Sequence, residues 1–323
     1  MADVVVDLNA VIVAVTREVP RCLTVQRDAR TLGSPAGDEG TVEALVFGPL
    51  DPVGDRTLDL QLRGFVRQQT GLELGYVDQL YTFGDRNRGP AGSRVVSIAY
   101  LALVREAEPS GEARWRDWYR FFPWEDWRSG RPAMLDEAVL PAVAPWVAAA
   151  PSPALTRQRR ERADIAFGLG GAPWDGERVL DRYELLYEMG LVAEARRDRP
   201  AGDFPVPEPV AGLGRPMALD HRRILATALG RLRGKIRYRP VVFELLPSVF
   251  TLLQLQRVVE ALAGVGLHKQ NFRRLVEKGG LVEGTGRKNS DTGGRPAELF
   301  RFRREVLRER PAPGVGLPSA RPA

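Results

Sequence analysis

Residues 268–278 carry the side chains whose chemistry is easiest to interpret. They are rich in lysine, arginine, asparagine and glutamine, which hydrogen-bond to base edges in the major groove of DNA and to its phosphates. At helical spacing, Phe272, Leu275 and Val276 point inward and leave the polar side chains mostly exposed. The predicted DNA contacts on this face are His268, Lys269, Gln270, Asn271, Arg273, Arg274 and Lys278.

The flanking residues supply the elements that such a helix needs. Thr251 can cap a preceding helix with apolar residues at helical spacing, and Gly264 would end it. After the second helix come a short strand at 281–283, a glycine-rich basic loop at 284–296 and a second strand at 299–302. This is the order of a winged helix-turn-helix. The alternative is an ordinary helical hairpin with a solvated, charged face.

The polar residues of this region are expected to play two roles. The expected base readers are Lys269, Gln270, Asn271 and Arg273. The expected contacts to phosphates or to the neighbouring minor groove are Arg274 and, from the basic loop, Arg287, Lys288 and Arg295. Loss of a phosphate contact weakens binding to all sequences alike, whereas loss of a base reader relaxes specificity.

The charge of the chain is unevenly distributed. The formal net charge is +6, but residues 213–310 carry 21 lysines and arginines against 9 carboxylates, a balance of +12 that leaves −6 for the rest. A basic module on an acidic body indicates a polyanionic partner for that module alone.

Length and composition exclude several classes of protein. A chain of 323 residues predicts two or three domains, and 44% hydrophobic with 27% charged residues is typical of a soluble globular protein. A single cysteine, Cys22, and two histidines argue against a disulfide framework or a zinc centre. With no signal-peptide pattern and no membrane-spanning apolar run, the expected compartment is the cytoplasm.

The N-terminal half alternates strands with one clear helix. Strands are predicted at 3–15, 21–26, 43–47, 76–83 and 94–104, and helices at 57–70 and 135–149. Gly71 is a natural end for the first helix. An aromatic segment at 115–127 is too apolar for a free surface, so it either packs across the sheet as a hydrophobic lid or lines a ligand pocket.

This arrangement resembles the Nudix fold, whose signature is G-x5-E-x7-R-E-U-x-E-E-x-G-U, with U apolar. Aligned on Gly71 and Leu72, the chain keeps the apolar and glycine frame but lacks every carboxylate. The aligned positions are Leu50, Arg56, Gly64, Phe65, Val66, Gln68, Gln69, Gly71 and Leu72.

Loss of the carboxylates decides the expected chemistry. Nudix hydrolysis needs clustered glutamate oxygens to hold Mg²⁺, whereas Gln68 and Gln69 are uncharged and Arg56 would repel the ion. We therefore predict no catalytic residues, no metal and no enzymatic activity. The alternative is a divergent Nudix hydrolase of a nucleoside diphosphate derivative, with a carboxylate set drawn from Glu43, Asp51 and Asp55.

A Nudix-like domain without its metal site can still bind a nucleotide. Tyr81 or Phe83 would meet a base, and phosphates would meet the arginines of the following loop and strand. Those arginines are Arg86, Arg88 and Arg94. Alternatively, they only solvate a loop.

Four regions are expected along the chain. They are a Nudix-like domain at 1–150, a helical connector at 151–205, a winged helix-turn-helix domain at 206–310 and a disordered tail at 311–323. The connector has a helix at 175–189, and another helix at 217–235 leads into a basic, strand-like stretch with Lys235, Arg237 and Arg239. That stretch would contact phosphate or sit at the domain joint.

Several stretches resemble the Nudix-related transcriptional regulators of NAD metabolism, the NrtR/NadQ-like family. They are KIRYRPVVFELLP (235–247), FTLLQLQRVVEAL (250–262), LHKQNFRRLVEKGGLVEGTGRK (267–288), GGRPAELFRF (293–302), YVDQLYTFGD (76–85), RVVSIAYLAL (94–103) and VLDRYELLYEMGLV (179–192). The resemblance implies an α+β protein, in which a Nudix-like α/β/α sandwich with a mixed sheet is followed by a helical connector and a winged helix.

The resemblance also implies a function. The family consists of homodimeric repressors of NAD biosynthesis or salvage genes that bind palindromic double-stranded operators. An adenine nucleotide-type effector (ATP, NAD or ADP-ribose) would bind the Nudix-like domain and change the affinity for DNA. No cofactor and no membrane would be required.

Overall fold

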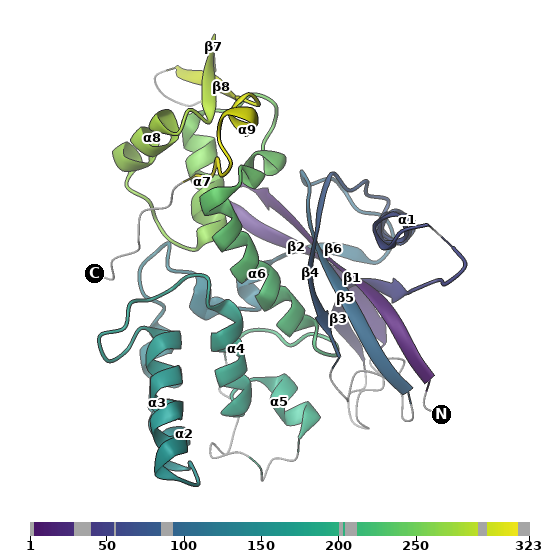
Figure 1. The fold of residues 1–323 in the computed structure, drawn as a ribbon, viewed down its shortest axis with the longest axis vertical. Coiled ribbons are helices and arrows are strands. Elements are labelled where there is room, and N and C mark those ends of the chain that lie inside the picture. Colours follow the sequence, from purple (N-terminus) through teal and green to yellow (C-terminus); the bar gives the residue numbers. More distant parts are fainter. Residues whose placement is uncertain are drawn as a thin grey trace.

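The computed structural model describes residues 3–28, 40–54, 56–84, 93–199, 203, 212–289 and 296–315. A mixed six-stranded sheet has one helix on one face and a group of helices on the other, with a small two-stranded sheet at the end of that group (Figure 1). The expected α+β fold with a mixed sheet is confirmed. None of the described helices is both long and apolar enough to cross a membrane.

The large sheet is built around its first strand. The strands are β1 (Asp3–Thr16), β2 (Val19–Asp28), β3 (Thr41–Pro49), β4 (Tyr76–Phe83), β5 (Ser93–Leu103) and β6 (Ala113–Asp117), in the order β4-β5-β1-β3-β2-β6. β1 runs parallel to β5 and antiparallel to β3, and its last residues pair with β2. Because β1 is central and covered on both faces, it is almost continuously apolar.

Alternate residues of β1 face the two layers. Leu8, Ala10 and Ile12 belong to a core shared with α1 (Leu58–Thr70), whose Leu62 and Val66 are fully buried. Thr57 caps α1 by accepting a hydrogen bond from Leu60 N at 3.3 Å, and Gly71 ends the helix at a φ of 72°. The predicted helix and its end are confirmed.

The opposite face carries the connector helices and α6. The elements are η2 (Trp118–Arg120), η3 (Pro123–Glu125), η4 (Leu135–Val139), α2 (Leu140–Ala148), α3 (Pro153–Phe167), α4 (Val179–Glu188), α5 (Ala193–Asp198) and α6 (His221–Tyr238). α6 lies between the sheet and α4 and packs against both (Figure 1). A single apolar cluster runs from Val11 of β1 through α4 and α6 to α7 (Leu252–Ala263).

Two predicted helix boundaries and one predicted strand differ from the structure. The helix expected at 175–189 begins at Val179, and the helix expected at 217–235 is α6. Lys235 and Arg237 therefore lie in the last turn of α6, and only Arg239 is extended. The strand-like interpretation was wrong because α6 continues to Tyr238 and ends only at the extended Arg239, the residue before Pro240.

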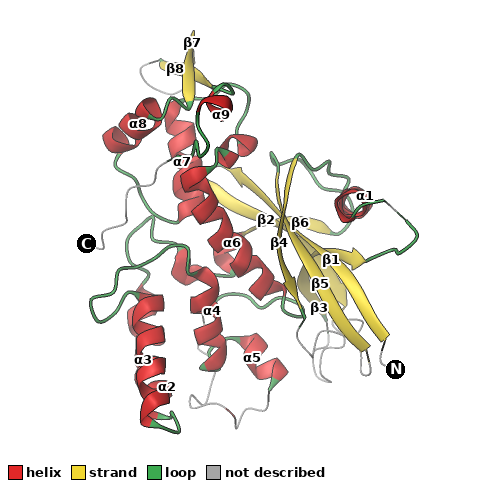
Figure 2. Cartoon of the chain, viewed as in Figure 1, coloured by secondary structure: helices red, strands yellow, loops and turns green. Residues whose placement is uncertain are grey.

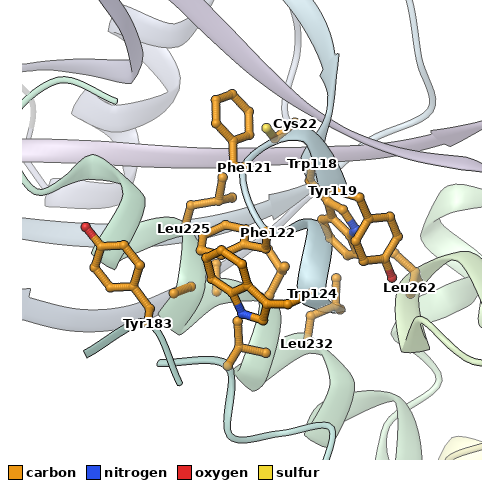
Figure 3. Packing of buried hydrophobic residues seen from close by; sticks show 14 of the residues in the cluster. Cys22, Trp118, Tyr119, Phe121, Phe122, Trp124, Tyr183, Leu225, Leu232 and Leu262 are labelled. Atoms are coloured by element: carbon orange, nitrogen blue, oxygen red, sulfur yellow. The ribbon is translucent and has the colours of Figure 1, made fainter. Parts of the chain in front are cut away.

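The aromatic segment is part of the core. Trp118, Phe121, Phe122 and Trp124 are fully buried. Figure 3 shows Phe122 and Trp124 near Leu225 and Leu232 of α6, and Tyr119 near Leu262 of α7. Of the two interpretations of this segment, the structure supports packing across the sheet, and these rings have no free face for a ligand.

The C-terminal region contains η6 (Val241–Leu245), α7, α8 (Lys269–Lys278), β7 (Val282–Asn289), β8 (Ala297–Phe302) and α9 (Val306–Glu309) (Figure 2). Thr251 and Gln254 form a capping box at the start of α7, and Gly264 ends it at a φ of 72°. An antiparallel bridge joins Phe250 to Phe300 of β8. The predicted helices and the two wing strands are confirmed.

Two predictions in this region need correction. Arg287 and Lys288 lie on β7 and not in the loop, because pairing with β8 extends β7 as far as Asn289 despite its glycines. The expected disorder after Arg310 is also contradicted as far as Val315. That residue is buried, and its N–H donates to Ile236 O at 2.9 Å.

Candidate nucleic-acid interface and sensor domain

Helix α8 presents a polar face to solvent. Phe272 and Val276 are buried and hold the helix on α7. All of the α8 residues that we expected to contact DNA are exposed, and so is His268, which directly precedes the helix. Among the described residues, none of these side chains takes part in a hydrogen bond or an ion pair. The structure thus brings these candidates together on one face, with their charges not neutralised by neighbours.

The start of α8 adds backbone donors to this face. His268 occupies the N-cap position, but its side chain makes no capping hydrogen bond, and the first turn holds no acidic residue. The first N–H groups of a helix lack helical partners and carry its positive end. Uncapped N–H groups beside Lys269 form an arrangement that favours a phosphate.

The small sheet carries a second group of basic side chains. Arg287 and Lys288 on β7 are exposed, and Arg295 lies outside the described residues. Two other arginines of this region are neutralised. Arg301 Nε donates to Glu283 at 2.6 Å, and Arg303 pairs with Glu309. The described wing therefore offers Arg287 and Lys288 as its available cations.

Glu260 fixes the turn between α7 and α8, a role that the sequence analysis missed. Its Oε1 accepts hydrogen bonds from Leu267 N and from Gln256 Nε2, each at 2.9 Å. A carboxylate in the last turn of a helix faces the negative end of the helix dipole. A glutamate at this unfavourable position near the end of a helix could have indicated that its carboxylate binds the following turn.

The residues aligned with the Nudix box lie on and beside α1. Arg56 and Gln68 are exposed, Gly64 and Phe65 are partly buried, and Gly71 ends the helix. Gln69 is engaged inside the domain. Its Nε2 donates to Phe47 O, and its Oε1 accepts from Arg27 Nη2, each at 2.9 Å. An arginine therefore contacts the position that aligns with a metal-binding glutamate.

The structure describes only two of the three residues in the alternative carboxylate set. Glu43 pairs with Arg116 at 2.6 Å and with Arg120 at 3.5 Å. Asp51 accepts from the nearby Val53 N, and Asp55 lies outside the described residues. No group of three metal-ligating side chains occurs in the part of the chain that the structure describes.

The nucleotide-contacting candidates are placed only in part. Tyr81 is 63% exposed, and its ring meets that of the buried Phe83 edge-on at 5.6 Å. Arg94 is exposed, and its Nη2 donates to Gly84 O at 2.6 Å. Arg86 and Arg88 lie outside the described residues. Their role in binding stays a prediction.

Polar contacts also tie α6 to the sheet. Lys235 Nζ donates to Asp78 Oδ2 at 2.6 Å and to Tyr76 Oη at 3.0 Å. Burial lowers the pKa of Lys235, but the hydrogen bonds to Asp78 and Tyr76 outweigh this effect and raise the pKa. Leu45 N donates to His221 Nδ1 at 3.0 Å, so a side chain of α6 completes the bonding of β3. Lys235 thus lies at the joint and not at a phosphate site.

A Nudix-like sheet domain continuous with a C-terminal winged helix-turn-helix is the class of fold that these observations define. Residues 242–302 match the family model described as the NrtR DNA-binding winged helix domain. The C-terminal part of this chain is therefore an NrtR-type winged helix, which confirms the resemblance for that part.

One curated relative is the "ADPR responsive transcriptional repressor NtrR" of Acinetobacter baylyi. It is 41% identical to this chain over 86 residues, which are 27% of this chain and 34% of the relative. The match thus spans about a third of the relative's length.

Solved structures share the fold over nearly the whole chain. The structure of Shewanella oneidensis NrtR with a 27mer DNA is 20% identical, with a TM-score of 0.54 over 94% of this chain and 95% of that one. A MutT/nudix family protein from Enterococcus faecalis is 13% identical, with a TM-score of 0.52 over 94% and 88% of the two chains. At these identities the likeness establishes the fold alone.

Proposed function

We propose that this chain is a DNA-binding transcriptional repressor whose affinity for its operator is set by a metabolite bound to the Nudix-like domain. The observation that carries the proposal is the exposed basic face of α8 within an NrtR-type winged helix. The base readers are Lys269, Gln270, Asn271 and Arg273. The phosphate contacts are Arg274, Arg287, Lys288 and Arg295, the last of which lies outside the described residues.

The regulated genes in this proposal are those of NAD biosynthesis or salvage. The protein acts as a cytoplasmic homodimer on a palindromic operator. In a dimer of this kind, two recognition helices about 34 Å apart reach successive turns on one face of the duplex. ADP-ribose is the first effector to test, since the curated relative is described as ADPR responsive. ATP and NAD are the other adenine-containing candidates.

We further propose that the chain is not an enzyme and needs no cofactor. The amide of Gln69 is held between Phe47 O and the cation of Arg27, and Glu43 is neutralised by Arg116. A divalent ion prefers anionic oxygens, so this donor set fits it poorly. If Mg²⁺ promoted release of product from ADP-ribose, the alternative of a divergent hydrolase would replace this part of the proposal.

Fluorescence anisotropy of labelled duplexes tests the main proposal. The duplexes come from upstream of the chain's own gene and of NAD-biosynthesis genes, and excess nonspecific DNA is present as competitor. ADP-ribose, ATP and NAD are added in turn. We expect binding that survives the competitor and changes with one of these nucleotides. Binding that the competitor abolishes would reduce the basic face to a nonspecific polyanion surface.

A substitution in the wing should change the salt dependence of binding. Arg287→Gln removes one phosphate contact, so the slope of log K against log salt should become shallower by about 0.9, with all sequences weakened alike. Arg301→Gln is the matched control, because Glu283 already neutralises that guanidinium. Equal slopes for both variants and the wild type would remove the wing from the DNA interface.

A further inference from the structure

The segment that follows β6 holds the turn of the helix-turn-helix. Trp127 N donates to Gly264 O at 2.7 Å, and Trp127 forms a parallel bridge with Val265. The hydroxyl of Tyr119 donates to Ala261 O at 2.8 Å. The segment begins at the edge of the large sheet, since Asp117 is the last residue of β6. The last turn of α7 and the turn before α8 are thus hydrogen-bonded to the segment that directly follows the edge strand of the large sheet.

A buried ionic cluster supports this contact. We define the Glu125 cluster as Glu125, Arg182, Arg233 and Tyr119. Glu125 accepts from Nε and Nη2 of Arg182, the latter at 2.9 Å, and from Nη1 of Arg233. Arg233 in turn donates to Leu262 O and to Glu125 O, each at 3.1 Å. The carbonyls at the C-terminal end of a helix lack helical partners. Here Tyr119 and Arg233 supply the missing hydrogen-bond donors.

The fit around Gly264 leaves no room for adjustment. A Cβ at this position would clash with the backbone carbonyl oxygen of Glu125, and it would also lie 2.7 Å from Nη2 of Arg233 and 2.8 Å from the Tyr119 hydroxyl. The glycine is therefore needed for its left-handed φ and also for the close approach of the Glu125 cluster.

A second contact comes from the tip of the β1–β2 hairpin. Arg17 and Glu18 both have left-handed backbone conformations there, with φ of 50° and 65°. Arg128 Nη1 donates to Glu18 O at 2.7 Å, and Arg257 of α7 lies 3.5 Å from the Glu18 carboxylate. The sensor sheet therefore touches α7 at two separate places.

We infer that Glu125 and Tyr119 are positioning residues of the DNA-binding site, which set the orientation of α8 from the edge of the sensor sheet through the 264–268 turn. The inference rests on the proposed function. It identifies the contact through which the large sheet can regulate DNA binding. Neither residue touches DNA. They act through Arg233 and the carbonyls of Ala261 and Leu262.

A hydroxyl deletion tests this inference with little disturbance of packing. Tyr119→Phe removes the donor to Ala261 O and keeps the buried ring. The matched control is Tyr187→Phe, which removes a hydroxyl that donates to Asp198 at 2.9 Å in the connector. Hydrogen–deuterium exchange and anisotropy are measured on the full-length wild type and both variants, with and without ADP-ribose.

We expect amides at 261–268 to exchange about fivefold faster in Tyr119→Phe alone, the equivalent of one ordinary hydrogen bond. Its specificity ratio, operator over nonspecific duplex, should fall by a similar factor, and the change in affinity caused by ADP-ribose should shrink. A general loss of stability would not move the specificity ratio.

The inference is overturned if Tyr119→Phe matches Tyr187→Phe in the exchange of residues 261–268. That comparison needs neither DNA nor effector. A wild type that fails to distinguish operator from random duplex would instead contradict the proposed function, while the exchange result would still decide the positioning role.

Discussion

Reversing the charge of Arg273 and Arg274 together should lower operator affinity at least about 100-fold, because each good base or phosphate contact contributes about 1–3 kcal/mol. Both guanidiniums are exposed on α8, and neither is paired with a described residue. In the Arg273→Glu/Arg274→Glu variant, two repulsive carboxylates would face the DNA backbone. Anisotropy at fixed salt measures the loss, and circular dichroism checks that the fold persists.

A matched control separates local contact from net charge. Arg157 and Arg160 are exposed on α3, in the helical connector, and the Arg157→Glu/Arg160→Glu variant changes the net charge by the same amount. We expect this control to retain most of its affinity, apart from weaker long-range attraction. If both double variants lost affinity equally, general charge and not the α8 face would account for binding.

Glu125→Ala should destabilise the protein by about 3–5 kcal/mol, because it leaves two arginines in the core without their counter-charge. Arg182 and Arg233 are 0% and 3% exposed, so bulk solvent does not screen their charges. Chemical denaturation measures the change. Glu137→Ala, at an exposed position on η4, is the control and should change stability by less than about 0.5 kcal/mol. A loss below about 1 kcal/mol for Glu125→Ala would mean that the core relaxes around the arginines.

The same glutamate gives stability a defined dependence on pH. Burial alone would raise the pKa of Glu125, but the guanidiniums of Arg182 and Arg233 outweigh burial and lower it. A carboxyl whose pKa is lower in the folded state contributes fully above its unfolded pKa of about 4.3, and this contribution is lost as the pH falls through the lower folded pKa. The stability difference between wild type and Glu125→Ala should therefore shrink in acid and stay constant near neutral pH.

Local signals predicted the C-terminal helices well. Thr251 and Gln254 form the capping box that their spacing indicates, and Gly264 ends α7. The polar face of α8 follows from helical periodicity alone, since Phe272 and Val276 are its buried residues. The length of β7 was underestimated because glycine is a poor strand residue, and only pairing with the distant β8 stabilises it.

Contacts between distant residues could not be read from the sequence. Glu125 lies 57 residues from Arg182 and 108 residues from Arg233, and no local pattern links them. The aromatic segment left two interpretations open, because burial against α6 depends on tertiary packing. The burial of Val315 was missed for a related reason, since a Pro- and Gly-rich tail resembles a disordered one until a partner surface is known.

The core that runs without a break from β1 to α7 limits how such a chain can be recombined. A fragment that begins at α6 and contains the winged helix would expose the apolar side of α6, which packs against the aromatic segment in the full chain. It would also leave Arg233 without its counter-charge, Glu125. A graft of this winged helix onto a foreign sensor would therefore have to carry residues 113–128 with it. For gene fusion or domain exchange, the smallest transferable unit therefore includes β6, the edge strand of the large sheet, as well as the winged helix.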